Sequence, residues 1–454
     1  MAPAWQVESA LSGVAWPAVP APGAASLLAL EFQLDHTQWL PADALAALQL
    51  TQLAGVVSHA WATVPHYRER WSGQYDPAQA LTWEAFRRLP LLTRADLQTR
   101  YAQMKSARIP SAHGAVVEAR TSGSTGSPVC VLKTELCGLF WNALTLREHA
   151  WHNRDMQGKL AAIRQGVQRG EGEGWGAATQ GTVRTGRAAT LPVSTPVSEQ
   201  LAWLQAQNPD YLLTHPTNLG ALAQLSIRNG VKLPRLREAR TSGEVLTQEV
   251  RELVRQAWGV GVVDMYSTNE VGYIALQCPQ TDSYHAMAEG LLVEVVDESG
   301  NPAVAGKVGR ILVTALSNFA TPLIRYDIGD YAEVGPPCAC GRGLPVLKRI
   351  IGRVRNMLVT ADGGRYWPAF GMRGLTDRMP VIQHQFVQKD FDLLEVRLVT
   401  SRQLTSEEEG EIGRLLLGRL PTAFRLQFVY CEQIPRSAGG KFEDFISEVR
   451  IPAQ

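Results

Sequence analysis

Positive charge is missing from the beginning of the sequence, where no lysine or arginine precedes Arg68. Secretory signals and mitochondrial presequences both depend on basic residues near the N-terminus. The sequence also has no apolar run that approaches the roughly 18 residues of a membrane-spanning helix. We therefore expect a cytoplasmic protein that does not bind a membrane.

Neither sign of charge is in excess, since 44 lysines and arginines face 43 acidic residues and leave a net charge of +1. Nucleic-acid-binding proteins usually carry a basic surface, so we expect no nucleic-acid partner. Cysteine is scarce as well, with six residues in 454. In a cytosolic chain of this size, that number argues against a disulfide framework and leaves metal binding open.

The chain is too long for one hydrophobic core, and its 454 residues indicate two or three domains. Apolar residues recur at helical spacing over 42–63, and Val64-Pro65 ends this predicted helix. From residue 159 onward, short apolar runs alternate with helical patterns, which indicates an α/β fold with a parallel sheet and crossover helices. The predicted strands are 159–163, 211–214, 236–240 and 260–265.

The loops that follow these strands are the candidate walls of a site, because ligands of such sheets bind beyond the carboxyl ends of the strands. The longest of these loops, 164–187, holds seven glycines between Gly166 and Gly186 and few apolar residues. We expect it to form a mobile loop over the site rather than packed structure.

A separate small α/β domain is predicted from about Ile351 to the end of the sequence. Residues 381–387 and 393–399 alternate as a β-hairpin, 406–420 have the pattern of an amphipathic helix, and 425–431 form a further strand. We therefore divide the chain into a large N-terminal domain, 1–351, and a small C-terminal domain, 352–454.

A stretch rich in hydroxyls and glycine predicts a phosphate-binding loop. Glycine lets the backbone approach a ligand closely, and serine and threonine hydroxyls donate to phosphate oxygens. The residues are Thr121, Ser122, Gly123, Ser124, Thr125 and Gly126. A surface turn is the alternative interpretation. Because Gly126 is followed by Ser127-Pro128, the Walker A lysine is absent, which disfavours a kinase-like P-loop enzyme.

A second group of residues has the composition of a zinc site. Six residues separate Cys278 from His285, and Cys338 and Cys340 form a Cys-x-Cys pair before a glycine-containing turn. Three thiolates and an imidazole suit a closed tetrahedral Zn²⁺ site, which would be structural because no position stays open for substrate. The alternative is a set of buried cysteines with an unrelated histidine.

Five motifs across about 320 residues resemble, in the same order, those of the adenylate-forming enzymes, the acyl-CoA synthetase and luciferase superfamily. The first is the ATP-phosphate loop, Thr121 to Pro128 followed by Thr134. The others are Asp264 to Glu270 for Tyr-Gly-x-Thr-Glu, Arg325 to Asp330 for Arg-Thr-Gly-Asp, Gly352-Arg353 for the hinge-side motif, and Pro435 to Lys441 for the C-terminal lysine motif.

The phenylacetate-CoA ligase-like branch, which includes relatives from capsule-biosynthesis clusters, is the most similar one. It shares the run Val64 to Arg68 and the turn Asp362 to Gly364. The resemblance implies the fold of these enzymes, in which a large N-terminal domain with parallel sheets carries a small, mobile C-terminal lid.

The resemblance also implies roles for individual residues. Tyr266 would lie against the adenine of ATP or AMP, with Gly243 and Glu244 on the opposite side. Asp330 would bind both ribose hydroxyls and Arg353 would close over the ribose. The Tyr-Gly-x-Thr-Glu-like motif would further contribute Asp264, Ser267 and Asn269.

Two residues are expected to act on the reacting groups. Glu270 would hold Mg²⁺, which prefers carboxylate and phosphate oxygens together. Lys441 would bridge the substrate carboxylate and the α-phosphate of ATP.

The implied activity is ATP-dependent activation of a small-molecule carboxylic acid, aromatic or similarly apolar. The acid attacks the α-phosphate, so that an acyl-adenylate forms and pyrophosphate leaves. Coenzyme A is the expected acceptor, which would give a thioester. An amine, a hydroxyl or the thiol of a carrier protein is the alternative acceptor, and a non-catalytic nucleotide-binding relative is disfavoured because Glu270 and Lys441 are both present.

Overall fold

The computed structural model describes residues 5–121, 128–353, 357–362, 364–366, 379–434 and 442–449. Its N-terminal part is helical. The helices before the first strand are α1 (Pro22–Thr37), α2 (Ala42–Thr63), α3 (Pro65–Arg70), α4 (Trp83–Arg87), α5 (Arg94–Thr99), η1 (Tyr101–Met104) and η2 (Ser111–His113). The bounds of α2 match the predicted helix, and the helix ends where Pro65 begins α3.

A short antiparallel hairpin joins this part to the main sheet. It consists of β1 (Val116–Arg120) and β2 (Cys130–Thr134), and the long helix α6 (Glu135–Trp151) follows directly. Thr121 and Val129 are hydrogen bonded at the end of the hairpin, since each backbone N–H of this pair donates to the other residue. The two ends of the predicted phosphate loop are thereby held together, although Ser122 to Ser127 lie outside the described residues.

One sheet of twelve strands, counted over the described residues, forms the centre of the large domain. Five neighbouring strands are parallel, namely β8 (Gly261–Thr268), β7 (Glu238–Ser242), β6 (Tyr211–Thr214), β3 (Leu160–Arg164) and β5 (Ala188–Pro192). The predicted parallel strands are confirmed, with bounds shifted by up to three residues. Three helices link them, namely α7 (Val197–Gln207), α8 (Pro216–Asn229) and α9 (Gln248–Trp258).

The remaining strands of this sheet run antiparallel to their neighbours. They are β4 (Gly170–Gly172), β9 (Gly272–Gln277), β10 (Tyr284–Ala286), β11 (Leu291–Val296), β12 (Val308–Ala315), β13 (Tyr326–Val334) and β14 (Val346–Arg353). The parallel part is covered on both faces, because α7, α8 and α9 pack on one side and α6 on the other. Parallel strands need this double cover to bury their apolar side chains.

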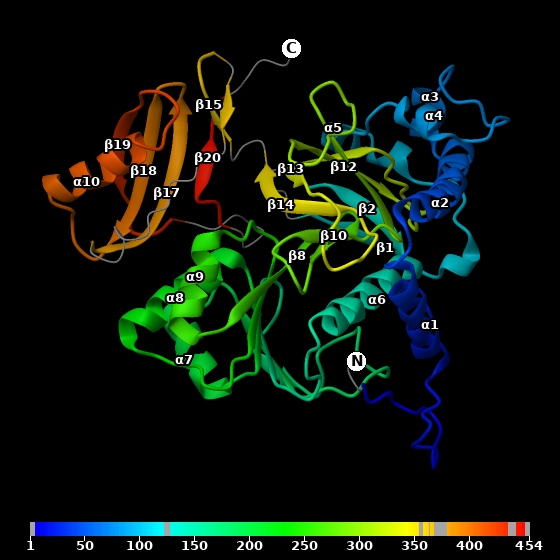
Figure 1. Ribbon diagram of the computed structural model, residues 1–454, viewed down its shortest axis with the longest axis horizontal. Coiled ribbons are helices and arrows are strands. Elements are labelled where there is room, and N and C mark those ends of the chain that lie inside the picture. The colour runs from blue at the N-terminus through cyan, green and yellow to red at the C-terminus, as the bar shows by residue number, and fades with distance from the viewer. Residues whose placement is uncertain are drawn as a thin grey trace.

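The C-terminal domain has a four-stranded sheet with its own hydrophobic core. The strands are β17 (Val381–Asp390), β18 (Leu393–Thr400), β19 (Arg425–Tyr430) and β20 (Phe445–Ser447), and α10 (Ser406–Leu417) packs against them. A small hairpin, β15 (Leu358–Val359) and β16 (Arg365–Tyr366), precedes the sheet. In Figure 1 this domain forms a separate lobe beside α8 and α9.

The α/β fold class predicted from the sequence is confirmed by this architecture. In the part of the chain that the structure describes, no helix combines the length and the apolar character that crossing a bilayer requires.

Candidate functional site

A cleft of about 1330 Å³ opens at the carboxyl ends of the parallel strands and extends to the C-terminal domain. The cleft is lined by ten of the residues predicted from the sequence: Thr121, Gly243, Glu244, Asp264, Tyr266, Ser267, Asn269, Glu270, Asp330 and Arg353. Ser122, Gly123, Ser124, Thr125, Gly126 and Lys441 lie outside the described residues. Their two flanking residues, Thr121 and Phe442, both line the cleft.

Tyr266, Asp330 and Arg353 form one hydrogen-bonded group. The Tyr266 hydroxyl donates to Oδ2 of Asp330 at 2.7 Å, and Nε of Arg353 lies 3.4 Å from Oδ1. Asp330 and Arg353 face each other because β13 and β14 pair in this register. Burial, together with the Asp330 charge, holds the pKa of Tyr266 well above its ordinary value, so the hydroxyl remains a donor. The carboxylate of Asp330 is thereby oriented by a hydroxyl on one oxygen and a guanidinium beside the other.

Glu270 is buried, with 8% of its surface exposed, and lies close to two cations. Nη1 of Arg94 is 3.5 Å from its Oε1. Lys133 is the second cation. Burial lowers the pKa of Lys133, whereas the charges of Cys137 and Glu270 act in the opposite direction. A carboxylate in the cleft that Thr121 also lines fits Mg²⁺ that is also bound to phosphate oxygens. Such an ion would replace Arg94 as the partner of Glu270.

Asp264 lines the cleft, but protein side chains occupy both of its oxygens. The Thr241 hydroxyl donates to Oδ1 at 2.6 Å and the Tyr284 hydroxyl donates to Oδ2 at 2.9 Å. Burial raises the pKa of Asp264 to about 6, although these hydrogen bonds oppose the shift. The residue joins β7, β8 and β10, so we expect Asp264 to position Tyr266 rather than to contact a nucleotide.

Glu244 connects three parts of the molecule. Its Oε2 accepts hydrogen bonds from the backbone N–H of Thr217 at 3.0 Å and from the Thr217 hydroxyl at 2.7 Å. Its Oε1 accepts a hydrogen bond from the backbone N–H of Phe442 at 2.7 Å. Gly243, just before it, has a φ of +88°, a conformation that glycine adopts without strain. The Gly-Glu turn therefore contacts both α8 and the C-terminal domain.

Another part of the cleft lies between α6 and the sheet, and its residues belong to no motif. The rings of Trp141 and Tyr273 stack with their centroids 4.2 Å apart. Trp175 and Arg164 border the same space. Sequence analysis missed these residues because nothing in the spacing of α6 distinguishes a cleft-facing side chain from a core-facing one.

The glycine-rich segment 164–187 borders the cleft as expected, through Trp175 and its neighbours. The expectation of little packed structure is wrong for its second half. Thr182 and Val183 are buried, and Val183 forms a β-bridge with Val7. The Trp175 indole N–H donates to the Gly158 carbonyl at 3.0 Å. The N-terminal residues, far away in the sequence, supply the surface on which the segment packs.

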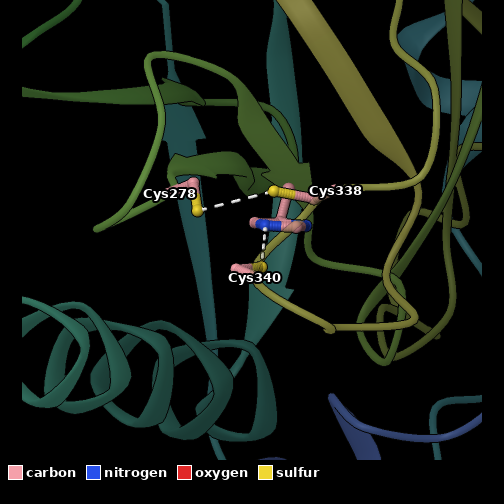
Figure 2. Close-up of side chains that lie close together, drawn as sticks. Cys278, Cys338 and Cys340 are labelled. Atoms are coloured by element: carbon pink, nitrogen blue, oxygen red, sulfur yellow. Dashed lines mark hydrogen bonds between the residues drawn. The ribbon is translucent and has the colours of Figure 1, made fainter.

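The four predicted zinc ligands lie together. Cys278 follows β9, His285 is in β10, and Cys338 and Cys340 are in the loop between β13 and β14. Their ligand atoms all lie within 4.8 Å of one another. Figure 2 shows the three sulfurs directed toward a common point, with Cys278 Sγ 3.7 Å from Cys338 Sγ and Cys340 Sγ 3.3 Å from His285 Nε2.

The spacing of these atoms suits a tetrahedral zinc ion. With Zn–S bonds of about 2.3 Å, tetrahedral angles separate two sulfurs by about 3.8 Å, close to the Cys278–Cys338 distance. The backbone N–H of Gln280 donates to Cys278 Sγ at 3.4 Å and so helps to fix this sulfur in position. None of the four residues lines the cleft, so a metal here would stabilise the fold without reaching the reacting groups.

Comparison with known proteins connects both domains to one group of enzymes. Residues 371–448 match the family of the CapK C-terminal domain. The chain is 29% identical to phenylacetate-coenzyme A ligase of Thermus thermophilus over 334 residues, which covers 70% of this chain and 73% of that protein. It is 26% identical to phenylacetate-coenzyme A ligase of Escherichia coli over 428 residues, which covers 90% and 96%.

Solved structures give the same fold. 2-Hydroxyisobutyryl-CoA ligase, in the postadenylation state with 2-HIB-AMP, superposes with a TM-score of 0.73 at 21% identity and covers 91% of this chain and 92% of its own. The same ligase in the thioesterification state, with 2-HIB-AMP and CoA, gives a TM-score of 0.59 at 20% identity, with 91% of each chain covered. The backbone of this chain therefore superposes better on the postadenylation state.

Proposed function

Because the chain belongs to the adenylate-forming enzymes, in their phenylacetate-CoA ligase-like branch, we propose that this AMP-forming ligase activates an aromatic carboxylic acid and transfers it to coenzyme A. The first half-reaction joins the acid to the α-phosphate of ATP and releases pyrophosphate. The second transfers the acyl group to the CoA thiol and releases AMP.

One observation carries this proposal. Residues from three distant segments, represented by Thr121, by Tyr266 with Glu270, and by Asp330, border a single cleft together with Phe442 of the small domain. Their side chains match the three parts of ATP. Asp330 offers a carboxylate to the ribose diol, Tyr266 offers an aromatic ring to the base, and Glu270 offers a carboxylate to a metal at the phosphates.

The roles of the remaining residues follow from this arrangement. Tyr266 and Arg353 hold Asp330 in place at the cleft, where its oxygens can accept hydrogen bonds from both ribose hydroxyls. Mg²⁺, when bound by Glu270, neutralises charge on the phosphates. Lys441 directly precedes Phe442 in the sequence, and Phe442 lines the cleft. We propose that Lys441 acts from the small domain and that this domain is a mobile lid that follows β14.

The test is pyrophosphate release from ATP with a panel of carboxylic acids, measured with and without CoA. The proposal expects acid-dependent release, with turnover that becomes sustained when CoA is added. Release that CoA does not accelerate would favour the alternative acceptors, an amine, a hydroxyl or a carrier-protein thiol. Without any acid-dependent release, the chain would not be an acid-activating ligase.

A further inference from the structure

Two elements border a chamber within the cleft, the helix α6 and the face of the sheet that α6 covers. On β3, Ala161 and Ile163 pack into the core under α7, α8 and α9. Alternation along a strand therefore turns Leu160 and Arg164 to the α6 face, and both line the cleft. Since the expected nucleotide-binding residues Tyr266, Asp330 and Arg353 come from β8, β13 and β14, this chamber beside α6 and β3 is the space that remains for the acid.

The buried charges beside the chamber balance one another. Glu148, with no exposed surface, accepts hydrogen bonds from Arg154 at 2.5 and 2.6 Å and from Arg240 at 2.6 Å. Glu238 accepts a further hydrogen bond from Arg154 at 2.6 Å. Two carboxylates and two guanidinium groups therefore form a neutral network, as burial requires.

Arg164 adds a positive charge to this neutral surface. Within the part of the chain that the structure describes, its side chain forms neither a hydrogen bond nor an ion pair. It lies near the rings that wall the chamber. Burial raises the pKa of the Tyr273 hydroxyl, and the Arg164 guanidinium is close enough to act against that shift. No described aspartate or glutamate in the cleft lining comes from α6 or β3.

We propose that Arg164 forms a subsite for an anionic or hydrogen-bond-accepting oxygen at the far end of the acid, so that the substrate is an aromatic acid with a second carboxylate or a ring hydroxyl. The inference rests on the proposed function and narrows its substrate class. The rings of Trp141, Tyr273 and Trp175 surround a flat body, and the planar guanidinium binds a carboxylate through two parallel hydrogen bonds.

The experiment compares pyrophosphate release from phenylacetate with release from its 3- and 4-hydroxy and 3- and 4-carboxy derivatives. The wild-type protein should use at least one substituted acid with a kcat/KM about 10- to 100-fold higher than that of phenylacetate, the range of a hydrogen bond to a charged group. In Arg164→Leu this preference should disappear, while Arg164→Lys should keep part of it.

Arg169→Leu is the matched control, because it removes a positive charge from the same segment at an exposed residue outside the cleft lining. It should retain the wild-type preference. The subsite is wrong, and the proposed function stands, if the kcat/KM for phenylacetate equals or exceeds that for every substituted acid. The same conclusion follows if Arg164→Leu raises the KM for ATP equally with all acids. If no acid releases pyrophosphate, the proposed function fails and the subsite fails with it.

Discussion

Glu244 of the large domain accepts a hydrogen bond of 2.7 Å from the backbone N–H of Phe442, the residue that follows Lys441. The same carboxylate is fixed from behind by the N–H and the hydroxyl of Thr217, at the first turn of α8. The backbone directly after Lys441 is therefore bound by the Glu244 side chain, which Thr217 itself fixes through two hydrogen bonds.

We expect Glu244→Gln to slow adenylation selectively. Glutamine has one acceptor oxygen, so it can satisfy Thr217 or Phe442 but not both, and a hydrogen bond to a charged group contributes about 1.5–3 kcal/mol. The adenylation rate should therefore fall about 10- to 100-fold, which is this free energy converted into a ratio of rates. Thioester formation from a synthetic acyl-adenylate should change little.

Thr217→Val is the matched control for Glu244→Gln, since it removes one hydrogen bond to the carboxylate and leaves the contact to Phe442. Its adenylation rate should stay within a few fold of wild type. Equal losses in both half-reactions of Glu244→Gln would show that the residue supports the fold or the nucleotide site and not the position of the lid.

Lys441→Ala should abolish adenylation while ATP still binds. The expected role of the lysine is to neutralise charge between the substrate carboxylate and the α-phosphate as the new bond forms. Single-turnover measurements from acid and ATP should show the loss, and a synthetic acyl-adenylate should restore thioester formation. Adenylation by the variant at the wild-type rate contradicts the assignment.

Glu270→Gln should raise the Mg²⁺ concentration needed for half-maximal rate. The amide keeps the shape of the side chain but lacks the charge that binds a hard cation. Arg94→Gln provides a contrast, because it frees Glu270 from its 3.5 Å ion pair and should lower the Mg²⁺ requirement. If the two variants shift this requirement in the same direction, Mg²⁺ and Arg94 do not compete for Glu270 as proposed.

Purified protein should contain about one Zn²⁺ per chain. Cys338→Ser should lower the zinc content and should also lower the melting temperature by several degrees. The cluster joins the strand end at Cys278 to a loop sixty residues later, so its loss loosens the large domain. Elemental analysis and thermal unfolding measure the two effects.

Cys431→Ser, outside the cluster, should change neither the zinc content nor the melting temperature. A protein free of zinc, or full zinc content in Cys338→Ser, would rule out the four-ligand site.

Asp264→Asn should change how stability depends on pH. Burial raises the pKa of the folded-state carboxyl from 3.8 to about 6, so the folded protein holds this proton more tightly than the unfolded chain. The resulting stabilisation is complete below pH 3.8 and is lost as pH rises through about 6. A shift of two pKa units corresponds to about 3 kcal/mol.

Asparagine resembles the protonated acid, and the Thr241 and Tyr284 hydroxyls can donate or accept as it requires. The variant should therefore be more stable than wild type at pH 7.5, by an amount that shrinks toward pH 5. Urea unfolding at several pH values measures this difference. A constant difference, or a variant that is less stable at pH 7.5, contradicts a raised pKa.

Elements with strong local signals were predictable from the sequence. The helix 42–63 has both apolar periodicity and a proline at its end, and the parallel strands are apolar runs bounded by polar loops. The packing of the glycine-rich segment was not predictable, because the surface it contacts includes Val7, which lies 176 residues earlier in the chain.

The candidate site divides in the same way. Residues such as Tyr266 and Asp330 lie within short motifs whose order along the chain could be recognised. Arg94 and Arg164 have no such context, and only the pairing of distant strands and helices brings them to the cleft. The occupied carboxylate of Asp264 could not be foreseen either, since Tyr284 reaches it from another strand.

Arg353 is the last residue of β14, and its backbone remains paired with Asp330 of β13. From the sequence we expect the lid to turn about the residues that follow this strand, near Arg355, which lies outside the described residues. A rotation there would carry Lys441 away and leave the Asp330–Arg353 pair unmoved. Asp330 and Arg353 would then stay bound to the ribose of the acyl-adenylate while the lid rotates. The reactive intermediate would be retained until the acceptor arrives and would not be released to hydrolysis in bulk water.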